Sequence, residues 1–366
     1  MSDRATRLAG VLPEIGADLL LVTSLVNVRY LTGYTGSNGL ALVGPGTSVF
    51  ITDFRYVEQS AAEVDGAFDL RIAMLDLAEG LSEVLPAGPV RLAFEDANLT
   101  VRAHERLRSL MPDRVELVAA GDPVESLRAV KEPGEIERIR AAAEVADTAF
   151  RQLLEAGLVG RTERDVADAL ARAVRECGAK GMSFDAIVAA GPHGALPHAQ
   201  PRDVEIGTGE LVVIDWGAEL DGYCSDCTRT LATGDPGEPA REAYELVRQA
   251  QLVGVEAVRA GVSGRDTDAA ARAVIDAAGQ AEHFGHGLGH GVGLEIHEAP
   301  RLSQRSDAVL QSGNVVTVEP GVYLPGTGGV RIEDTLVVRA GGAGADTGTA
   351  ACAEILTMTT KELLVL

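Results

Sequence analysis

The chain has 366 residues, 46% of them hydrophobic, which predicts two domains with substantial cores. Lys and Arg number 32 against 54 Asp and Glu, and this net charge of −22 argues against nucleic-acid partners, because a phosphate backbone would be repelled. Four cysteines are too few for a disulfide framework in a chain of this length. The sequence shows no signal peptide and no apolar run of about 20 residues. We therefore expect a cytoplasmic protein without a membrane partner.

Residues 1–125 alternate between helical and strand patterns, which predicts a smaller α/β domain. Apolar runs separated by turn residues indicate strands, and Asp53 is placed to cap a helix. The expected strands are 17–23, 40–43, 48–52, 70–73 and 91–94, and the expected helices include 4–16 and 53–64. The domain contains no G-x-G-x-x-G, P-loop or G-x-S-x-G motif, so nucleotide binding and serine hydrolysis have no support.

The segment 121–135 has the proline, glycine and charge content of a domain junction, so a second domain is expected over residues 126–366. The helix that begins after Pro133 carries one apolar stripe at spacings of three and four residues. Further expected elements are a helix at 161–176, a strand at 183–189, and a second pair of helices at 240–260 and 265–278.

Two hairpin-like segments, 209–231 and 312–338, repeat each other at an offset of 104 residues. Each segment carries one carboxylate at the end of an apolar run and another in the following D-x-T or E-x-T motif. These carboxylates are Asp215 and Asp226 in the first copy and Glu319 and Glu333 in the second. A helical pair followed by a hairpin, present twice, predicts an α+β fold with internal pseudo-two-fold symmetry.

Packing of the two hairpins side by side would bring the four carboxylates together among Val and Ile residues. Four buried like charges are prohibitive unless something neutralises them. Two divalent cations would balance the charge, and oxygen ligands with one imidazole favour Mn, Co or Zn. The imidazole is expected in the segment 285–298, GHGLGHGVGLEIHE, between the hairpins.

The histidines gather in the second domain, which holds six of the seven. On an extended backbone His286, Leu288 and His290 would share one face, so the two imidazoles could point into one site. The histidines without such a context are interpreted as structural or surface residues: His104, His193 and His283. Cys224 and Cys227 form a C-x-x-C motif, but on a strand they would face opposite sides, so we interpret them as structural.

The run HGLGHGVGLEIHE, with the four carboxylates around it, resembles the proline-specific metallopeptidase family that includes aminopeptidase P, Xaa-Pro dipeptidase (prolidase) and methionine aminopeptidase. The similarity extends from about residue 130 to the C-terminus, and YLTGYTGSNG at 30–39 resembles the creatinase-like N-terminal domain of that family. The resemblance implies a pita-bread fold for the second domain and two divalent metal ions per chain, with Mn preferred. The additional N-terminal domain disfavours methionine aminopeptidase.

The resemblance also implies a role for each ligand. Asp215 would bind the first metal, Asp226 and Glu333 would bind both, and His290 and Glu319 would complete the second site. Glu319 would in addition act as the general base for the attacking water and then as the acid for the leaving nitrogen.

Other residues around the ligands match positions of the family that contact substrate or support the site. His297 would donate to the developing oxyanion, and His198 would contact the scissile amide. His286 would line the substrate pocket, and Arg331 would support the metal ligands together with Tyr323.

The resemblance implies small peptide substrates with proline at P1′. The scissile bond is then a tertiary amide without an N–H, so its recognition requires a dedicated pocket. Arg301 matches a prolidase arginine that binds the C-terminal carboxylate of a dipeptide, which favours Xaa-Pro dipeptidase slightly over aminopeptidase P; an exposed structural arginine is the alternative interpretation of this residue. An inactive binding protein on the same scaffold and a metal-free, creatinase-like hydrolase are alternatives that the complete ligand set disfavours. A homodimer is expected from the family.

Overall fold

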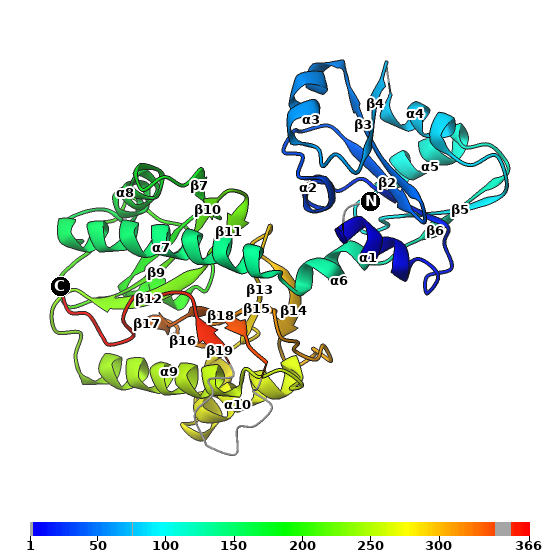
Figure 1. The fold of residues 1–366 in the computed structure, drawn as a ribbon. Helices are drawn as coiled ribbons and strands as arrows, with labels where there is room; N and C mark the ends of the chain where they lie inside the picture. The colour runs from blue at the N-terminus through cyan, green and yellow to red at the C-terminus, as the bar shows by residue number, and fades with distance from the viewer. Residues whose placement is uncertain (1–2, 75, 341–352) are drawn as a thin grey trace. The chain divides into compact units, whose positions relative to one another are not determined.

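The chain folds into two compact units, Met1–Arg128 and Ala129–Leu366. The structure is a computed structural model, and it describes residues 3–74, 76–340 and 353–366. Helix α6 (Pro123–Ala129) reaches the division between the units (Figure 1). Within these described ranges, no helix is both long and apolar enough to span a bilayer.

The first unit is built on one six-stranded sheet with the strand order β4-β3-β2-β1-β5-β6 (Figure 1). Strand β1 is buried along its whole length and pairs with β2 on one side and β5 on the other, as its continuous apolar run requires. The strands are β1 (Leu19–Val22), β2 (Leu40–Gly44), β3 (Thr47–Asp53), β4 (Asp69–Ala73), β5 (Val90–Phe94) and β6 (Val115–Ala119). The helices before α6 are α1 (Asp3–Val11), α2 (Leu25–Thr32), η1 (Phe54–Tyr56), α3 (Val57–Glu63), α4 (Leu77–Val84) and α5 (Val101–Leu110).

Two helices of this unit differ from the expectation. Helix α1 ends at Val11 instead of reaching residue 16, because the residue before Pro13 is disfavoured in helical conformation. Helix α2 was not predicted, since its buried side chains are almost contiguous in sequence and leave no periodic stripe. Asp53 does cap the following turn, and its side chain accepts a hydrogen bond from the Arg55 backbone N–H.

The second unit contains two helical pairs on opposite sides of a layer of short sheets (Figure 1). The helical elements are α7 (Pro133–Ala156), α8 (Glu163–Glu176), η2 (Gly191–Ala195), α9 (Glu238–Ala257), α10 (Gly264–Ala277) and η3 (Ala281–His283). The strands of the first repeat are β7 (Gly181–Met182), β8 (Ile187–Ala190), β9 (Leu211–Trp216), β10 (Ala218–Leu220), β11 (Tyr223–Cys224) and β12 (Cys227–Ala232). The strands of the second are β13 (Gly289–Gly291), β14 (Glu298–Leu302), β15 (Val315–Val318), β16 (Gly321–Leu324), β17 (Gly328–Arg331), β18 (Asp334–Val338) and β19 (Ala353–Ile355).

The strand topology repeats as the sequence predicts. The first copy forms the sheet β12-β9-β8, and the second forms β14-β13-β15-β18-β19, whose central strands β13-β15-β18 correspond to β8-β9-β12. Strands β9 and β15 begin at Leu211 and Val315, an offset of 315 − 211 = 104 residues. Of the strand expected at 183–189, only residues 187–189 form a strand, as part of β8, whereas β7 lies just before the expected range.

Each repeat has an apolar core of its own. In the first, Phe150 of α7 stacks on Trp216 of β9 with ring centroids 4.0 Å apart, and the Trp216 indole donates to the Ala146 carbonyl at 3.0 Å. In the second, Val316 and Leu336 are fully buried beneath the helices of that copy. These cores hold the strands that carry the predicted site residues.

Candidate metal centre and active site

The five predicted metal ligands lie in or directly beside buried strands. Asp215 belongs to β9 and His290 to β13. Asp226 directly precedes β12, Glu333 directly precedes β18, and Glu319 directly follows β15. Because apolar neighbours fix each strand, the positions of these side chains follow from the sheets.

Four of the five side chains meet within a few ångströms. Ligand atoms of Asp226, His290 and Glu333 all lie within 4.8 Å of one another. His290 Nε2 lies 3.6 Å from Asp226 Oδ2 and 3.4 Å from Glu319 Oε1. The Nδ1 of His290 lies 3.1 Å from the carbonyl oxygen of Gly291, so Nε2 is the nitrogen directed at the carboxylates.

Burial and mutual repulsion make this cluster unfavourable without a cation. Burial raises the pKa of Asp226 well above its usual range, and the charges of Glu333 and Asp215 raise it further. Burial also raises the pKa of Glu333, as does the nearby Glu319. For Glu319, burial acts in the same direction, but the hydrogen bond and charge of His290 lower its pKa to about 2. One imidazole and the buried Arg331, which pairs with Asp215, cannot balance four carboxylates, so protons or metal cations must supply the remaining positive charge.

Arg331 links Asp215 to Tyr323 and, through the Tyr323 hydroxyl, to His286. Its Nη2 donates to Asp215 Oδ2 at 2.6 Å, and its Nη1 donates to the Tyr323 hydroxyl at 2.9 Å and the Pro197 carbonyl at 3.0 Å. The Tyr323 hydroxyl also lies 2.9 Å from His286 Nε2. Burial lowers the pKa of His286, which favours the neutral imidazole at neutral pH. The hydrogen bond from Arg331 Nη1 to the Tyr323 hydroxyl is the contact expected between these two residues.

A cavity of about 440 Å³ lies over the cluster. Its lining includes the five predicted ligands together with His198, His286, His297, Arg301 and Arg331. His198, His297 and Arg301 are exposed, so they are accessible to a small molecule that enters the cavity. Arg301 lies directly across from His290 in the pairing of β14 with β13.

One detail of the histidine prediction is wrong. His286 and His290 both line the cavity, but Leu288 packs in the apolar core of the second repeat and not beside them. The extended segment is limited to Gly289–Gly291, so strict alternation of side chains does not extend back to His286. His193 and His283 lie outside the cavity lining.

The donor set fits hard or borderline divalent cations. Asp215 Oδ1 is buried and lacks a hydrogen-bond partner among the described residues, as expected of an oxygen intended for a metal. The atoms that face one another are carboxylate oxygens and one imidazole nitrogen. Cys224 and Cys227 are buried in two different cores, outside the ligand cluster. The carboxylates and His290 therefore suit a metal centre.

Family models cover both units of the chain. The model described as metallopeptidase family M24 matches residues 137–340, and the model described as creatinase/prolidase N-terminal domain matches residues 4–130. The chain belongs to metallopeptidase family M24. Membership confirms the predicted enzyme class and the predicted fold, a pita-bread catalytic domain after a creatinase-like domain. It also supports a requirement for divalent metal.

Proteins named as Xaa-Pro peptidases match the whole chain. A protein named Xaa-Pro dipeptidase from Pyrococcus furiosus is 36% identical, and the match covers 100% of both chains. A solved structure described as Xaa-Pro dipeptidase from Bacillus anthracis has a TM-score of 0.93 and 39% identity, covering 100% of this chain and 99% of that one. A structure described as X-Pro aminopeptidase from Thermotoga maritima has a TM-score of 0.89 and 34% identity, with both chains fully covered.

Thr228 is a site residue of this M24 member that the sequence reasoning did not assign. Its Oγ1 donates to Glu333 Oε2 at 2.7 Å and accepts from Arg331 Nε at 3.1 Å. The signal was visible in the repeated motifs, because Thr228 is the threonine of D-x-T in the first copy. In the second copy Thr335 occupies the same motif position and donates to the Asp226 carbonyl at 2.8 Å.

Proposed function

We propose that this metallopeptidase hydrolyses the peptide bond before proline in Xaa-Pro dipeptides and uses two divalent cations. The proposal rests on one observation: the buried carboxylates and His290 form the floor of a small cavity whose lining includes Arg301. Manganese is the proposed metal, since oxygen-rich ligation with one imidazole suits it, and cobalt or zinc are the alternatives.

The proposed ligand assignment uses residues from both repeats. Asp215 would hold one cation, His290 and Glu319 the other, and Asp226 and Glu333 would contact both. When bound, two such cations act as Lewis acids and lower the pKa of a water molecule. Asp226 and Glu333 are buried among other carboxylates, and both effects disfavour their charged forms. Cations bound in this way would neutralise that charge.

Glu319 is proposed as the proton carrier of the reaction. Its carboxylate lines the cavity and lies 3.4 Å from His290 Nε2, so it is placed to accept a proton from the attacking water and pass it to the leaving nitrogen. Burial and the neighbouring His290 lower the pKa of His297, which suits a neutral hydrogen-bond donor to the developing oxyanion. His198, exposed in the cavity lining, would contact the scissile amide.

Arg301 supports a dipeptide as the substrate. A guanidinium forms paired hydrogen bonds with a carboxylate, so Arg301 would bind the C-terminus of a proline residue that occupies the cavity. A small cavity of about 440 Å³ is compatible with a dipeptide. The names of the Pyrococcus furiosus and Bacillus anthracis relatives, both Xaa-Pro dipeptidases, support the same substrate class.

A second candidate function is that of aminopeptidase P, which acts on longer peptides. The fold similarity to the Thermotoga maritima protein described as X-Pro aminopeptidase supports it. We also propose a homodimer, as the family resemblance implies.

Hydrolysis assays with matched peptides test the proposal. Purified protein is incubated with Mn²⁺ and either Ala-Pro, Met-Pro or Arg-Pro-Pro, and released amino acids are quantified. Turnover of the two dipeptides alone indicates a dipeptidase, whereas cleavage of Arg-Pro-Pro indicates aminopeptidase P. If Mn²⁺ binds but none of the peptides is cleaved, the proposed function is wrong. Parallel assays with Co²⁺ and Zn²⁺ test the choice of metal.

A further inference from the structure

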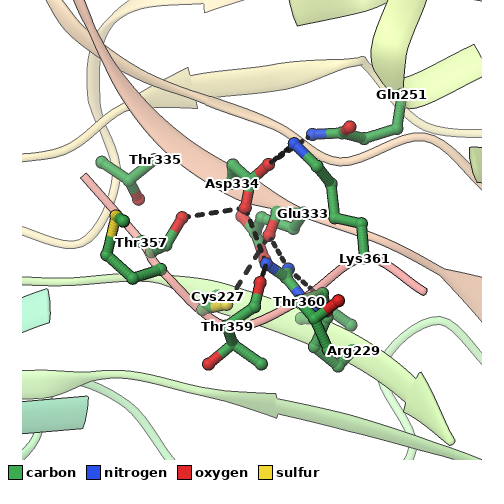
Figure 2. Close-up of polar contacts among 12 residues, drawn as sticks. Cys227, Arg229, Gln251, Glu333, Asp334, Thr335, Thr357, Thr359, Thr360 and Lys361 are labelled. Carbon is green, nitrogen blue, oxygen red and sulfur yellow. Dashed lines mark hydrogen bonds and ion pairs between the residues drawn. The ribbon is translucent and has the colours of Figure 1, made fainter. Parts of the chain in front are cut away.

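A second buried polar cluster lies next to Glu333 (Figure 2). Its residues are not among those that line the cavity. It consists of Arg229, Asp334 and Lys361 with Gln251 and Thr357, and is called here the back cluster. The side chains of Arg229 and Asp334 are 2% and 1% exposed, and that of Lys361 is 19% exposed. The proposed function does not use these residues, yet burial of three charged groups requires an explanation.

Asp334 is the centre of the back cluster, and four donors surround its carboxylate (Figure 2). Its Oδ1 accepts from Arg229 Nη2 at 2.8 Å and from Thr357 Oγ1 at 2.9 Å. Its Oδ2 accepts from Lys361 Nζ at 2.6 Å and from Gln251 Nε2 at 2.9 Å. The carboxylate is thus fixed in orientation by α9, β12 and the C-terminal segment at once.

The back cluster holds the backbone that carries proposed metal ligands. Asp334 is the residue after Glu333, so the two side chains point to opposite sides of the chain. The Arg229 Nη1 donates to the Glu333 carbonyl and to the Thr228 carbonyl, the latter at 2.9 Å. The Glu333 N–H in turn donates to the Thr228 carbonyl at 3.0 Å. These contacts connect the two repeats directly beside Glu333.

The C-terminal segment Thr357–Lys361 closes the back cluster. Arg229 also donates to the carbonyl oxygens of Thr359 and Thr360, the latter at 2.8 Å. The same segment is held from the other side by Asp147 of α7, which accepts from the Met358 N–H at 2.7 Å and the Thr359 hydroxyl at 2.6 Å. The end of the chain therefore packs against both repeats behind the proposed metal centre.

Stability alone does not account for such a cluster. A buried ion pair costs about as much in desolvation as it returns, and well-packed apolar residues would serve stability equally well. The back cluster instead fixes geometry. Because hydrogen bonds have preferred angles, those of the cluster hold the backbone at Thr228 and Glu333 in one conformation. The carboxylates repel one another before a cation binds, so a fixed backbone is needed to keep the ligands close together.

We propose that Arg229, Asp334 and Lys361 are positioning residues that hold Glu333 and Thr228 in place for cation binding. The inference rests on the metal centre of the proposed function, but not on the identity of the peptide substrate. It makes a prediction of definite sign. Loss of the positive charge of Lys361 would strengthen cation binding if the back cluster acted only through its electrostatic field, because like charges repel. Loss of a positioning residue weakens cation binding instead.

Isothermal titration calorimetry of the metal-depleted full chain with Mn²⁺ tests the proposal. We expect Asp334→Asn and Lys361→Met to raise the Kd for Mn²⁺ by about tenfold, as loss of groups that orient metal ligands does elsewhere. Lys361→Arg keeps the charge and the donor to Asp334, so it should restore the Kd to within about threefold of wild type. Lys361→Met serves as the informative variant if Asp334→Asn fails to fold.

Two control variants separate positioning from general effects. Leu170→Ala opens a cavity in the core of the first repeat and should lower the melting temperature without changing the Kd for Mn²⁺. Lys180→Met removes the same charge from the exposed pair with Glu219 and should change neither quantity. Unchanged or tighter Mn²⁺ binding by Lys361→Met would overturn the proposal whatever Asp334→Asn does, because removal of the Asp334 charge would weaken cation binding through the electrostatic field as well. Absence of Mn²⁺ binding by wild type would overturn it together with the metal centre, whereas wild type that binds Mn²⁺ without cleaving any of the three test peptides would refute the proposed function alone.

Discussion

Thr228 Oγ1 donates a hydrogen bond of 2.7 Å to Glu333 Oε2, and this contact joins the two copies of the internal repeat within the proposed metal centre. The same hydroxyl accepts from Arg331 Nε at 3.1 Å, and Arg331 in turn contacts Asp215. One fully buried hydroxyl therefore orients a carboxylate from one repeat and, through a guanidinium, a carboxylate from the other.

Thr228→Val removes this hydroxyl while nearly keeping the shape of the side chain. We expect the Kd for Mn²⁺ to rise about tenfold, because Glu333 loses a group that orients it. We also expect a loss of about 1–3 kcal/mol in the free energy of unfolding, since Arg331 Nε is left without its partner. Thr267→Val is the matched control, because Thr267 is equally buried but bonds only to the Ser263 carbonyl in α10, and it should affect stability alone.

Asp226→Ala should abolish hydrolysis of Ala-Pro while largely preserving the fold. The pKa of Asp226 is raised by burial and by like charges, so the metal-free protein should unfold at no lower temperature without this carboxylate. Saturating Mn²⁺ should raise the melting temperature of wild type more than that of the variant. A variant that retained more than about a tenth of the wild-type kcat would show that Asp226 is not a shared ligand.

Arg301→Met tests recognition of the dipeptide carboxylate. We expect KM for Ala-Pro to rise at least tenfold, about 1.4 kcal/mol of binding free energy, with a smaller change in kcat. Arg305→Met, also exposed but outside the cavity lining, should leave both parameters unchanged. An unchanged KM for Arg301→Met would favour aminopeptidase P, whose longer substrates place no carboxylate at this position.

Glu163→Gln tests a pH dependence of stability at a residue outside the cavity lining. Glu163 accepts from the backbone N–H groups of Ala190 and Arg202, both at 3.0 Å, and contacts His193 Nδ1 at 2.9 Å. Burial acts to raise its pKa, but the hydrogen bonds from Arg202 and Ala190 lower it overall. The carboxylate therefore stabilises the fold above the unfolded-state pKa of about 4.3, and this contribution disappears as pH falls through the lower folded-state pKa.

The measurement is urea unfolding of both proteins at a series of pH values from about 7 to about 3. Wild type should lose more stability than Glu163→Gln as the pH falls below about 4.5, so the two curves should converge in acid. Glu176→Gln, at the exposed end of the same helix, should give a curve parallel to that of wild type.

The repeat made much of the second unit predictable. A carboxylate at the end of an apolar run has few alternatives to a strand end, so Asp215 and Glu319 could be placed from the sequence. The conflict of buried like charges then predicted a cation site, and the structure places Asp226, His290 and Glu333 within 4.8 Å of one another.

The remaining features depended on contacts that no local pattern encodes. Leu288 turns into the core because the backbone around it is irregular, and strand alternation could not reveal this. Asp334 looked like one more acid in the second hairpin. Its structural role depends on hydrogen bonds from Arg229, 105 residues earlier, and from Lys361, 27 residues later. The roles of individual ligands remain predictions that the metal titrations above will test.

Asp215 and Asp226 come from the first repeat, and His290, Glu319 and Glu333 from the second, so the proposed centre is in effect a dimer interface within a single polypeptide. Tethering makes the meeting of the two surfaces an intramolecular event. Two separate copies of such a module would lose their cations on dilution as they came apart, whereas the tethered pair should keep the same affinity at any protein concentration.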